Sequence, residues 1–132
     1  MNIRFVASFA PIVTDRSATK RLYVDTFGLD LEDTDGYLHS ENVDGVKHFG
    51  LWPLEQAAEA CFGTKQWPSN VPRPQASLEF EVDDVREAAK ELEDRGYQLI
   101  HGARTEPWGQ TVARLLSPEG LIVGVSYSPQ LR

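Results

Sequence analysis

The feature that most constrains the fold of this chain is an internal repeat. Val13-Thr14-Asp15 precedes a helical segment, residues 16–27, that ends at Gly28, and Val82-Asp83-Asp84 precedes a second helical segment, residues 85–95, that ends at Gly96. Asp side chains accept hydrogen bonds from the free N–H groups at a helix start, and Gly adopts the left-handed backbone that ends a helix. In each half one strand-like segment precedes the helix and three follow it. The repeat therefore predicts two copies of a βαβββ unit.

The expected strands follow from apolar patterning and from turn residues. Asp35-Gly36 and Asp44-Gly45 lie between apolar runs and predict hairpins, and Ser117-Pro118-Glu119-Gly120 suits a type I turn. Between the two units, a short helical piece around residues 55–61 and a proline-spaced stretch are typical of a connector. We expect one α+β domain, 1–132, with module one at 1–53, the connector at 54–75 and module two at 76–132. The expected strands are residues 5–13, 29–32, 37–43, 46–52, 76–82, 97–103, 110–116 and 121–127.

Alternation along the last strand separates a bulky face from a small one. Leu121, Val123 and Val125 lie on one face, and Ile122, Gly124 and Ser126 lie on the other. The small face leaves space beside it, which we interpret as half of a binding cavity with Trp108 at the rim.

Charge and composition narrow the class of partner. The 132 residues carry a net charge of −7 without a clustered basic patch, which argues against nucleic acid and mildly favours a neutral or cationic ligand. No apolar run is long enough for a membrane helix and no signal peptide is recognisable, so we expect a cytoplasmic protein without a membrane partner. The single cysteine, Cys61, excludes an internal disulfide and is more typical of a small buried side chain than of a nucleophile.

Four segments in this order resemble the vicinal oxygen chelate superfamily, which includes glyoxalase I, extradiol dioxygenases, and fosfomycin and bleomycin resistance proteins. They are residues 22–29 (LYVDTFGL), 80–85 (FEVDDV), 106–110 (EPWGQ) and 116–120 (LSPEG). The resemblance covers nearly the whole chain. It implies two tandem βαβββ modules that form a curved mixed sheet, a half-barrel around a cleft, and a homodimer.

Enzymes of that superfamily hold a divalent metal on the first and last strand of each module, with His, Gln or Glu side chains. The aligned positions of this chain are Ser8 and Gly50 in module one and Ser77 and Gly124 in module two. Hydroxyls and glycines do not supply the imidazole and carboxylate ligands that such metals prefer. The resemblance is therefore to a metal-free, bleomycin resistance-like branch, and we expect no metal and no cofactor.

The expected function is binding of a small aromatic or cationic molecule, with sequestration of an antibiotic as the leading version. Several residues have a second interpretation: Trp108 covers a barrel end, Trp52 packs in a dimer, His48 is structural, and Arg114 is either a surface charge or an anion clamp. The alternative is an enzyme, a lyase, isomerase or dioxygenase, that uses a metal relocated to His48 with Glu79 or His101, or metal-free acid–base catalysis by Glu79. A structural dimer with a collapsed cleft is a third possibility. The predicted ligand-binding residues are Trp108, Trp52, His48, Ser8, Gly50, Ser77, Glu79, Arg114 and Gly124.

Overall fold

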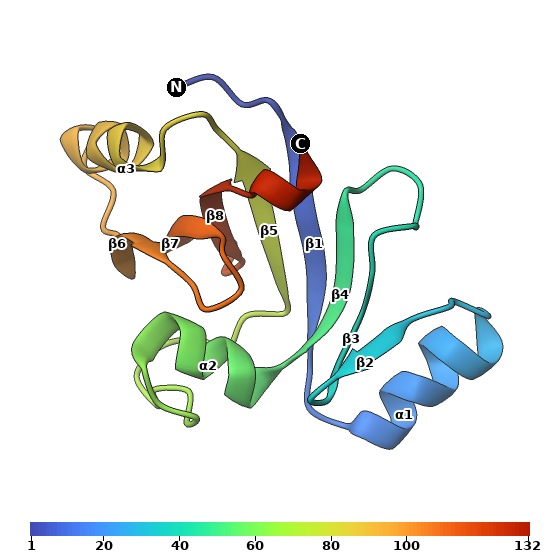
Figure 1. Cartoon of the computed structure of the whole chain (residues 1–132). Helices are drawn as coiled ribbons and strands as arrows, with labels where there is room; N and C mark the ends of the chain where they lie inside the picture. The colour runs from blue at the N-terminus through green and yellow to red at the C-terminus, as the bar shows by residue number, and fades with distance from the viewer.

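The computed structural model describes every residue, Met1 to Arg132, and folds into one mixed eight-stranded sheet (Figure 1). The strand order is β2-β3-β4-β1-β5-β8-β7-β6. The expected α+β fold with a curved sheet is confirmed. The elements are β1 (Phe5–Val13), α1 (Arg16–Lys20), η1 (Arg21–Thr26), β2 (Glu32–Thr34), β3 (Tyr37–Ser40), β4 (His48–Pro53), α2 (Leu54–Phe62), β5 (Ala76–Glu81), α3 (Val85–Asp94), β6 (His101–Thr105), β7 (Thr111–Leu116), β8 (Ile122–Tyr127) and η2 (Pro129–Leu131).

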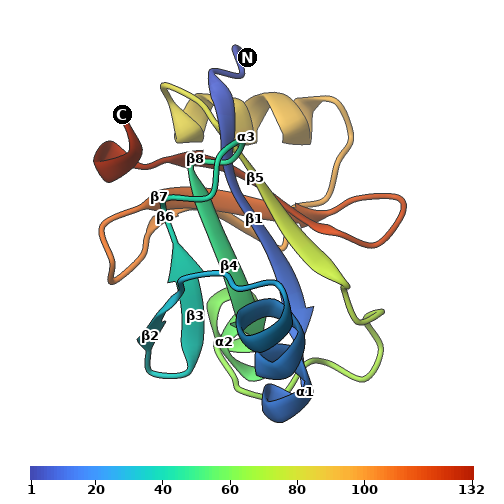
Figure 2. The same ribbon diagram turned by 90° about the vertical axis from the view of Figure 1, so that its right-hand side faces the viewer.

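The repeat is visible in the strand pairing and in the helix ends. In each half the first strand pairs in parallel with the last, β1 with β4 and β5 with β8, and the two halves join where β1 pairs antiparallel with β5. β4, β1 and β5 run side by side through the middle of the molecule (Figure 2). Asp15 accepts from the N–H of Ala18 and Asp84 from the N–H of Glu87, so both predicted caps are confirmed. Gly28 and Gly96 have φ of +73° and +94°, the left-handed backbone expected after each helix.

The two faces of the sheet are covered by different helices. On the outer face, Val85, Ala88 and Ala89 of α3 pack against Ala113 of β7 and Val125 of β8. On the inner face, α2 contributes Ala57, Ala58 and Cys61 to a cluster that contains Trp67 and Ile122. The alternation read along the last strand is therefore right, since Val125 and Ile122 point to opposite faces.

Element boundaries differ from expectation most clearly in four places. The first helical segment is α-helical only to Lys20 and continues as a π-helix. β2 begins at Glu32 instead of Leu29, because the turn at Asp35-Gly36 pairs Thr34 with Tyr37 and the hairpin extends from there. β3 ends at Ser40 instead of Val43. β6 begins only at His101, where its pairing with Arg114 starts.

The helical segment of module one covers its sheet far less than α3 covers module two. No residue of α1 or η1 is buried, and the ring of Tyr23 meets Phe49 of β4 with centroids 6.2 Å apart. Phe9, Leu22 and Phe27 remain exposed, the last to 62%. Figure 1 shows α1 at the far end of the molecule from α3. No helix of the chain is long and apolar enough to cross a membrane.

Candidate functional site on the inner face of the sheet

Five of the predicted ligand-binding residues, together with His101, form a row across six neighbouring strands. His48 of β4 lies opposite Ser8 of β1, and Ser8 lies opposite Glu79 of β5. Glu79 lies opposite Gly124 of β8, which lies opposite Arg114 of β7, and Arg114 lies opposite His101 of β6. Residues paired across a sheet point to the same face, so the row is one continuous strip of the inner face.

The two glycines of the predicted site do not border open space, so the expectation of a vacant cavity beside them is wrong. A Cβ atom on Gly50 would lie 2.6 Å from Cε1 of Tyr37 and closer still to its hydroxyl. A Cβ atom on Gly124 would lie 3.2 Å from Cγ of Glu79 and 3.1 Å from Cγ2 of Val112. Each glycine instead lets a side chain of the protein itself cross the strand. The glycine beneath Glu79 allows that carboxylate to approach Arg114 from the far side of β8.

Arg114 is buried, so the interpretation of this residue as a surface charge is wrong. Only 1% of the residue is exposed, and Nη1 donates to Nε2 of His101 at 3.1 Å and to Oε1 of Glu106 at 3.5 Å. Its Nη2 lies 3.9 Å from Oε2 of Glu79. The guanidinium also lies 5.6 Å from the ring centroid of Trp52, so this cation occupies a face that was expected to stack on a ligand.

Glu79 is held by a hydrogen bond from the loop between β6 and β7. It is 7% exposed, and Oε1 accepts from Nε2 of Gln110 at 2.7 Å. Burial raises the pKa of Glu79, and the Arg114 charge and the Gln110 hydrogen bond partly offset that rise. Gln110 in turn accepts from Nε1 of Trp108 at 2.9 Å. The Trp108 side chain is 54% exposed, so an accessible aromatic ring is connected through one amide to a buried carboxyl group.

Module one contributes a tyrosine–histidine pair that the sequence reading missed. The hydroxyl of Tyr37 and Nε2 of His48 are 2.7 Å apart, and Oε1 of Glu41 lies 3.8 Å from Nδ1. Burial lowers the pKa of His48, and the nearby His39 ring lowers it further. Burial, followed by the charge of Glu79, raises the pKa of Tyr37, which therefore stays a neutral phenol. No sequence motif marks Tyr37. The available signal was Gly50 on the neighbouring strand, since a glycine leaves room for a large side chain beside it.

His101 is fixed as a neutral imidazole. Its Nδ1 lies 2.7 Å from the carbonyl of Gly102, which can only accept, so Nδ1 carries the proton and Nε2 accepts from Arg114. Burial lowers the pKa of His101.

The superfamily metal does not fit these residues. Ser8 and Ser77 are buried, and Gly50 and Gly124 have no side chain that could supply a ligand atom. Nowhere in the chain do three His, Cys, Asp or Glu side chains gather in a metal-binding group. His48, Glu79 and His101 do not form the relocated metal site that the sequence suggested as an alternative. The positive charge in the strip is the side chain of Arg114.

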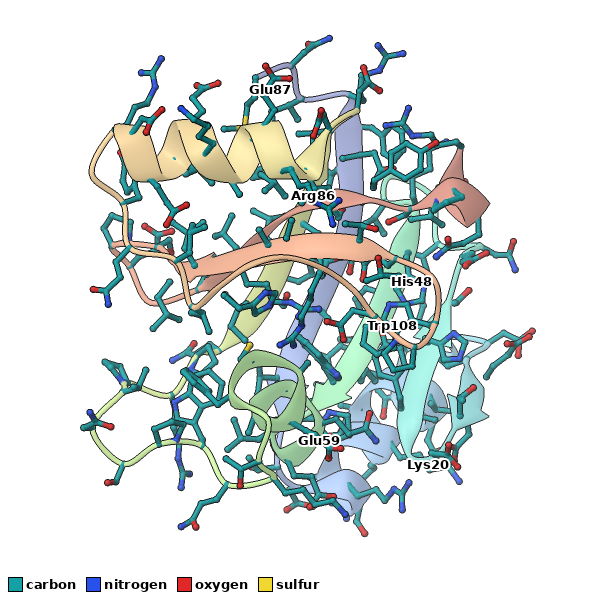
Figure 3. All side chains as sticks on the ribbon, turned by 60° about the vertical axis from the view of Figure 1, so that its left-hand side comes forward. Lys20, His48, Glu59, Arg86, Glu87 and Trp108 are labelled. Atoms are coloured by element: carbon teal, nitrogen blue, oxygen red, sulfur yellow. The ribbon has the colours of Figure 1, made fainter.

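Trp52 and Trp108 lie on different sides of this strip. Trp52 packs with the inner cluster around α2, whereas Trp108 lies on the loop between β6 and β7. Figure 3 shows Trp108 and His48 in the same region of the molecule, away from Glu87 on α3 and Lys20 on α1. A separate pocket of about 430 Å³ lies elsewhere, between the start of α1, the turn at Asp35-Gly36 and the start of α2.

A family model for the glyoxalase-like domain matches residues 7–130. The chain belongs to the glyoxalase-like domain family. Solved structures with the same fold include a glyoxalase/bleomycin resistance protein/dioxygenase superfamily member from Vibrio splendidus, with 12% identity, TM-score 0.60, and 96% of this chain and 100% of that chain covered. No curated protein sequence matches this glyoxalase-like chain.

Two further neighbours are methylmalonyl-CoA epimerases. One, in complex with methylmalonyl-CoA and NH4+, has 16% identity and a TM-score of 0.63, with 99% of each chain covered. The Q60A variant of the Streptomyces coelicolor enzyme has 17% identity and a TM-score of 0.62, with 97% of this chain and 99% of that chain covered. At such identities these glyoxalase-like neighbours establish the fold, and the chemistry must be argued from the residues of this chain.

Proposed function

We propose that this glyoxalase-like protein binds a small planar molecule on the inner face of its sheet, without the superfamily metal. The observation that carries the proposal is the connection from the exposed ring of Trp108, through Gln110, to the buried Glu79. The ring is a stacking surface at the rim, and the amide holds it in a fixed orientation above a polar floor. Sequestration of an antibiotic, as in bleomycin resistance proteins, is the specific version that we favour.

The residues at the former metal positions support binding over metal chemistry. Ser8 and Ser77 are buried hydroxyls, and the strip that contains Ser8 also holds a guanidinium and a carboxyl group. Such a floor orients polar groups of a ligand by hydrogen bonds, and the rim excludes water from one side of its ring.

Calorimetric titration with planar aromatic compounds, together with quenching of tryptophan fluorescence, tests the proposal. Trp108→Ala should weaken binding by roughly two- to tenfold, the equivalent of about 0.5–1.5 kcal/mol for an aromatic pair. Trp108→Phe keeps the ring face, removes the donor to Gln110 and should retain most of the affinity. Equal affinity of wild type and Trp108→Ala for every compound that binds would contradict the proposal.

A second candidate is metal-free acid–base catalysis by Glu79. It is favoured by the raised pKa of this buried carboxyl group and by the Tyr37–His48 pair on the other half of the strip. Methylmalonyl-CoA, bound in one structural neighbour, is the substrate to try first, with deuterium incorporation from D2O as the readout. Incorporation that is abolished by Glu79→Gln in a folded protein would favour this enzyme over the binding protein.

We also propose that two copies associate through the outer face of module one. Phe9, Leu22 and Phe27 are exposed there because α1 and η1 bury no residue.

The net charge of −7 supports a small molecule over nucleic acid as the partner. The single buried Cys61 is consistent with a cytoplasmic location.

A further inference from the structure

Arg114 has one hydrogen-bonding edge that the protein leaves empty. Nη1 donates to His101 and to Glu106, whereas Nε has no hydrogen-bond partner and is buried. Nη2 has Glu79 as its nearest carboxylate, at 3.9 Å, which is longer than a hydrogen bond. Nε and Nη2 together form the side-on edge with which arginine binds a carboxylate through two parallel hydrogen bonds. Buried donors without a partner are rare in native proteins, so this edge needs an occupant.

Two carboxylate oxygens near Arg114 are already engaged, whereas Oε2 of Glu79, 3.9 Å from Nη2, accepts no hydrogen bond. Oε1 of Glu106 accepts from Nε of Arg104 at 2.7 Å, and Oε1 of Glu79 accepts from Gln110 at 2.7 Å. The flat face of the guanidinium lies against Trp52. The edge is therefore the remaining route by which Arg114 can recognise another molecule.

We propose that the side-on edge of Arg114 binds the carboxylate of the planar ligand whose ring stacks on Trp108. This inference rests on the proposed function and assigns its ligand class. It replaces the cationic ligand favoured from net charge, because the buried cation of the strip is the protein's own arginine. A ligand carboxylate at this edge lies next to the carboxyl group of Glu79, and two adjacent negative charges repel.

Binding is consequently coupled to a proton on Glu79. A protonated Glu79 does not repel the ligand and leaves Glu106, on the Nη1 side, as the carboxylate paired with Arg114, so affinity should fall as pH rises and Glu79 ionises. Its surroundings on the neighbouring elements contain further charged and titratable groups. They are Arg114 of β7, Glu106 of the loop between β6 and β7, Glu81 of β5, Tyr37 of β3 and Cys61 of α2, and the neutral amide of Gln110 also donates to Glu79.

The test compares three naphthalene derivatives that differ in charge: 2-naphthoate, 2-naphthamide and 2-naphthylmethylammonium. Affinities are measured by calorimetry, and the Nε–H resonance of Arg114 is followed by NMR in the isotope-labelled protein. We expect 2-naphthoate to bind at least about tenfold more tightly than the amide and to shift the Arg114 Nε–H resonance. Its affinity should fall by up to about tenfold per pH unit as Glu79 ionises.

Two variants separate hydrogen-bond geometry from charge. Arg114→Lys keeps the positive charge but lacks the side-on edge. It should weaken the binding of 2-naphthoate roughly ten- to hundredfold and leave the affinity for 2-naphthamide unchanged. Arg86→Lys is the matched control, since Arg86 is exposed on α3 and forms no ion pair. If Arg114→Lys does not fold, Glu79→Gln tests the proposal in its place. It should raise the affinity for 2-naphthoate and abolish the pH dependence of that affinity.

The outcomes distinguish this inference from the function on which it rests. Equal binding of all three compounds with an unmoved Arg114 Nε–H resonance would overturn the carboxylate assignment and leave the binding function standing. Weaker binding of 2-naphthoate to Glu79→Gln would also overturn it. Failure of all three compounds to bind would contradict the proposed function and, with it, the inference.

Discussion

The substitution Gly50→Ala tests whether Tyr37 occupies the space above β4. A Cβ atom at position 50 would lie 2.6 Å from Cε1 of Tyr37, closer than real Cβ contacts, so the phenol ring must move. When it moves, the 2.7 Å hydrogen bond to His48 is lost. Gly102 of β6 is the matched control, because a Cβ atom there would meet nothing within 4 Å.

The expected magnitude combines two contributions. Overpacking of a well-packed position costs about 1–3 kcal/mol, and loss of the hydrogen bond costs about 0.5–1.5 kcal/mol. Gly50→Ala should therefore lower the free energy of unfolding by roughly 2–4 kcal/mol. Gly102→Ala should leave it unchanged or raise it by up to about 1 kcal/mol, since alanine restricts the unfolded chain.

Urea unfolding followed by circular dichroism measures both variants, and a double-mutant cycle isolates the contact. Tyr37→Ala removes the ring that the added methyl group at position 50 would meet. The double variant should therefore be at least about 1 kcal/mol more stable than the sum of the single changes predicts. Additive free energies, or a Gly50→Ala cost equal to that of Gly102→Ala, would refute the placement of Tyr37.

Two other predictions concern pH and association. Burial raises the pKa of Glu79, so its contribution to stability is present below the ordinary pKa of a glutamate and is lost as pH rises through the raised value. Wild type should therefore lose stability relative to Glu79→Gln as pH rises above about 4.3, the ordinary pKa of a glutamate, measured by urea midpoints, and a constant difference would contradict this. For the proposed dimer, light scattering should show dimeric wild type and monomeric Phe27→Glu, with Tyr97→Glu, another exposed aromatic, as the control that stays dimeric. A monomeric wild type would contradict the proposed dimer.

Much of the fold was predictable because it depends on local signals. The first strand was expected at residues 5–13 and lies there. Both helix caps, both terminal glycines and the turns follow from the conformational preferences of single residues. The edge strands were placed less well, because β2 and β6 begin where their partners allow pairing and their own residues carry weak alternation.

Less of the site was predictable. The sequence singled out Glu79 and Arg114 but did not show that both would be buried within 3.9 Å of each other. It missed Tyr37 and Gln110, which hold the strip from either side. Trp67 holds the connector, since its Nε1 donates to the carbonyls of Val71 and Pro72.

The sequence by itself determined the two βαβββ units and which residues of a strand share a face. Helix caps, turns and apolar alternation depend on a few neighbouring residues, and finding the same signals in both halves of the chain strengthens the prediction. The tertiary structure alone decided that Gly50 and Gly124 make room for Tyr37 and Glu79 instead of for a ligand. It also decided that Arg114 keeps an empty edge. These outcomes depend on register between strands far apart in the chain, where a shift of one residue would turn every side chain to the other face.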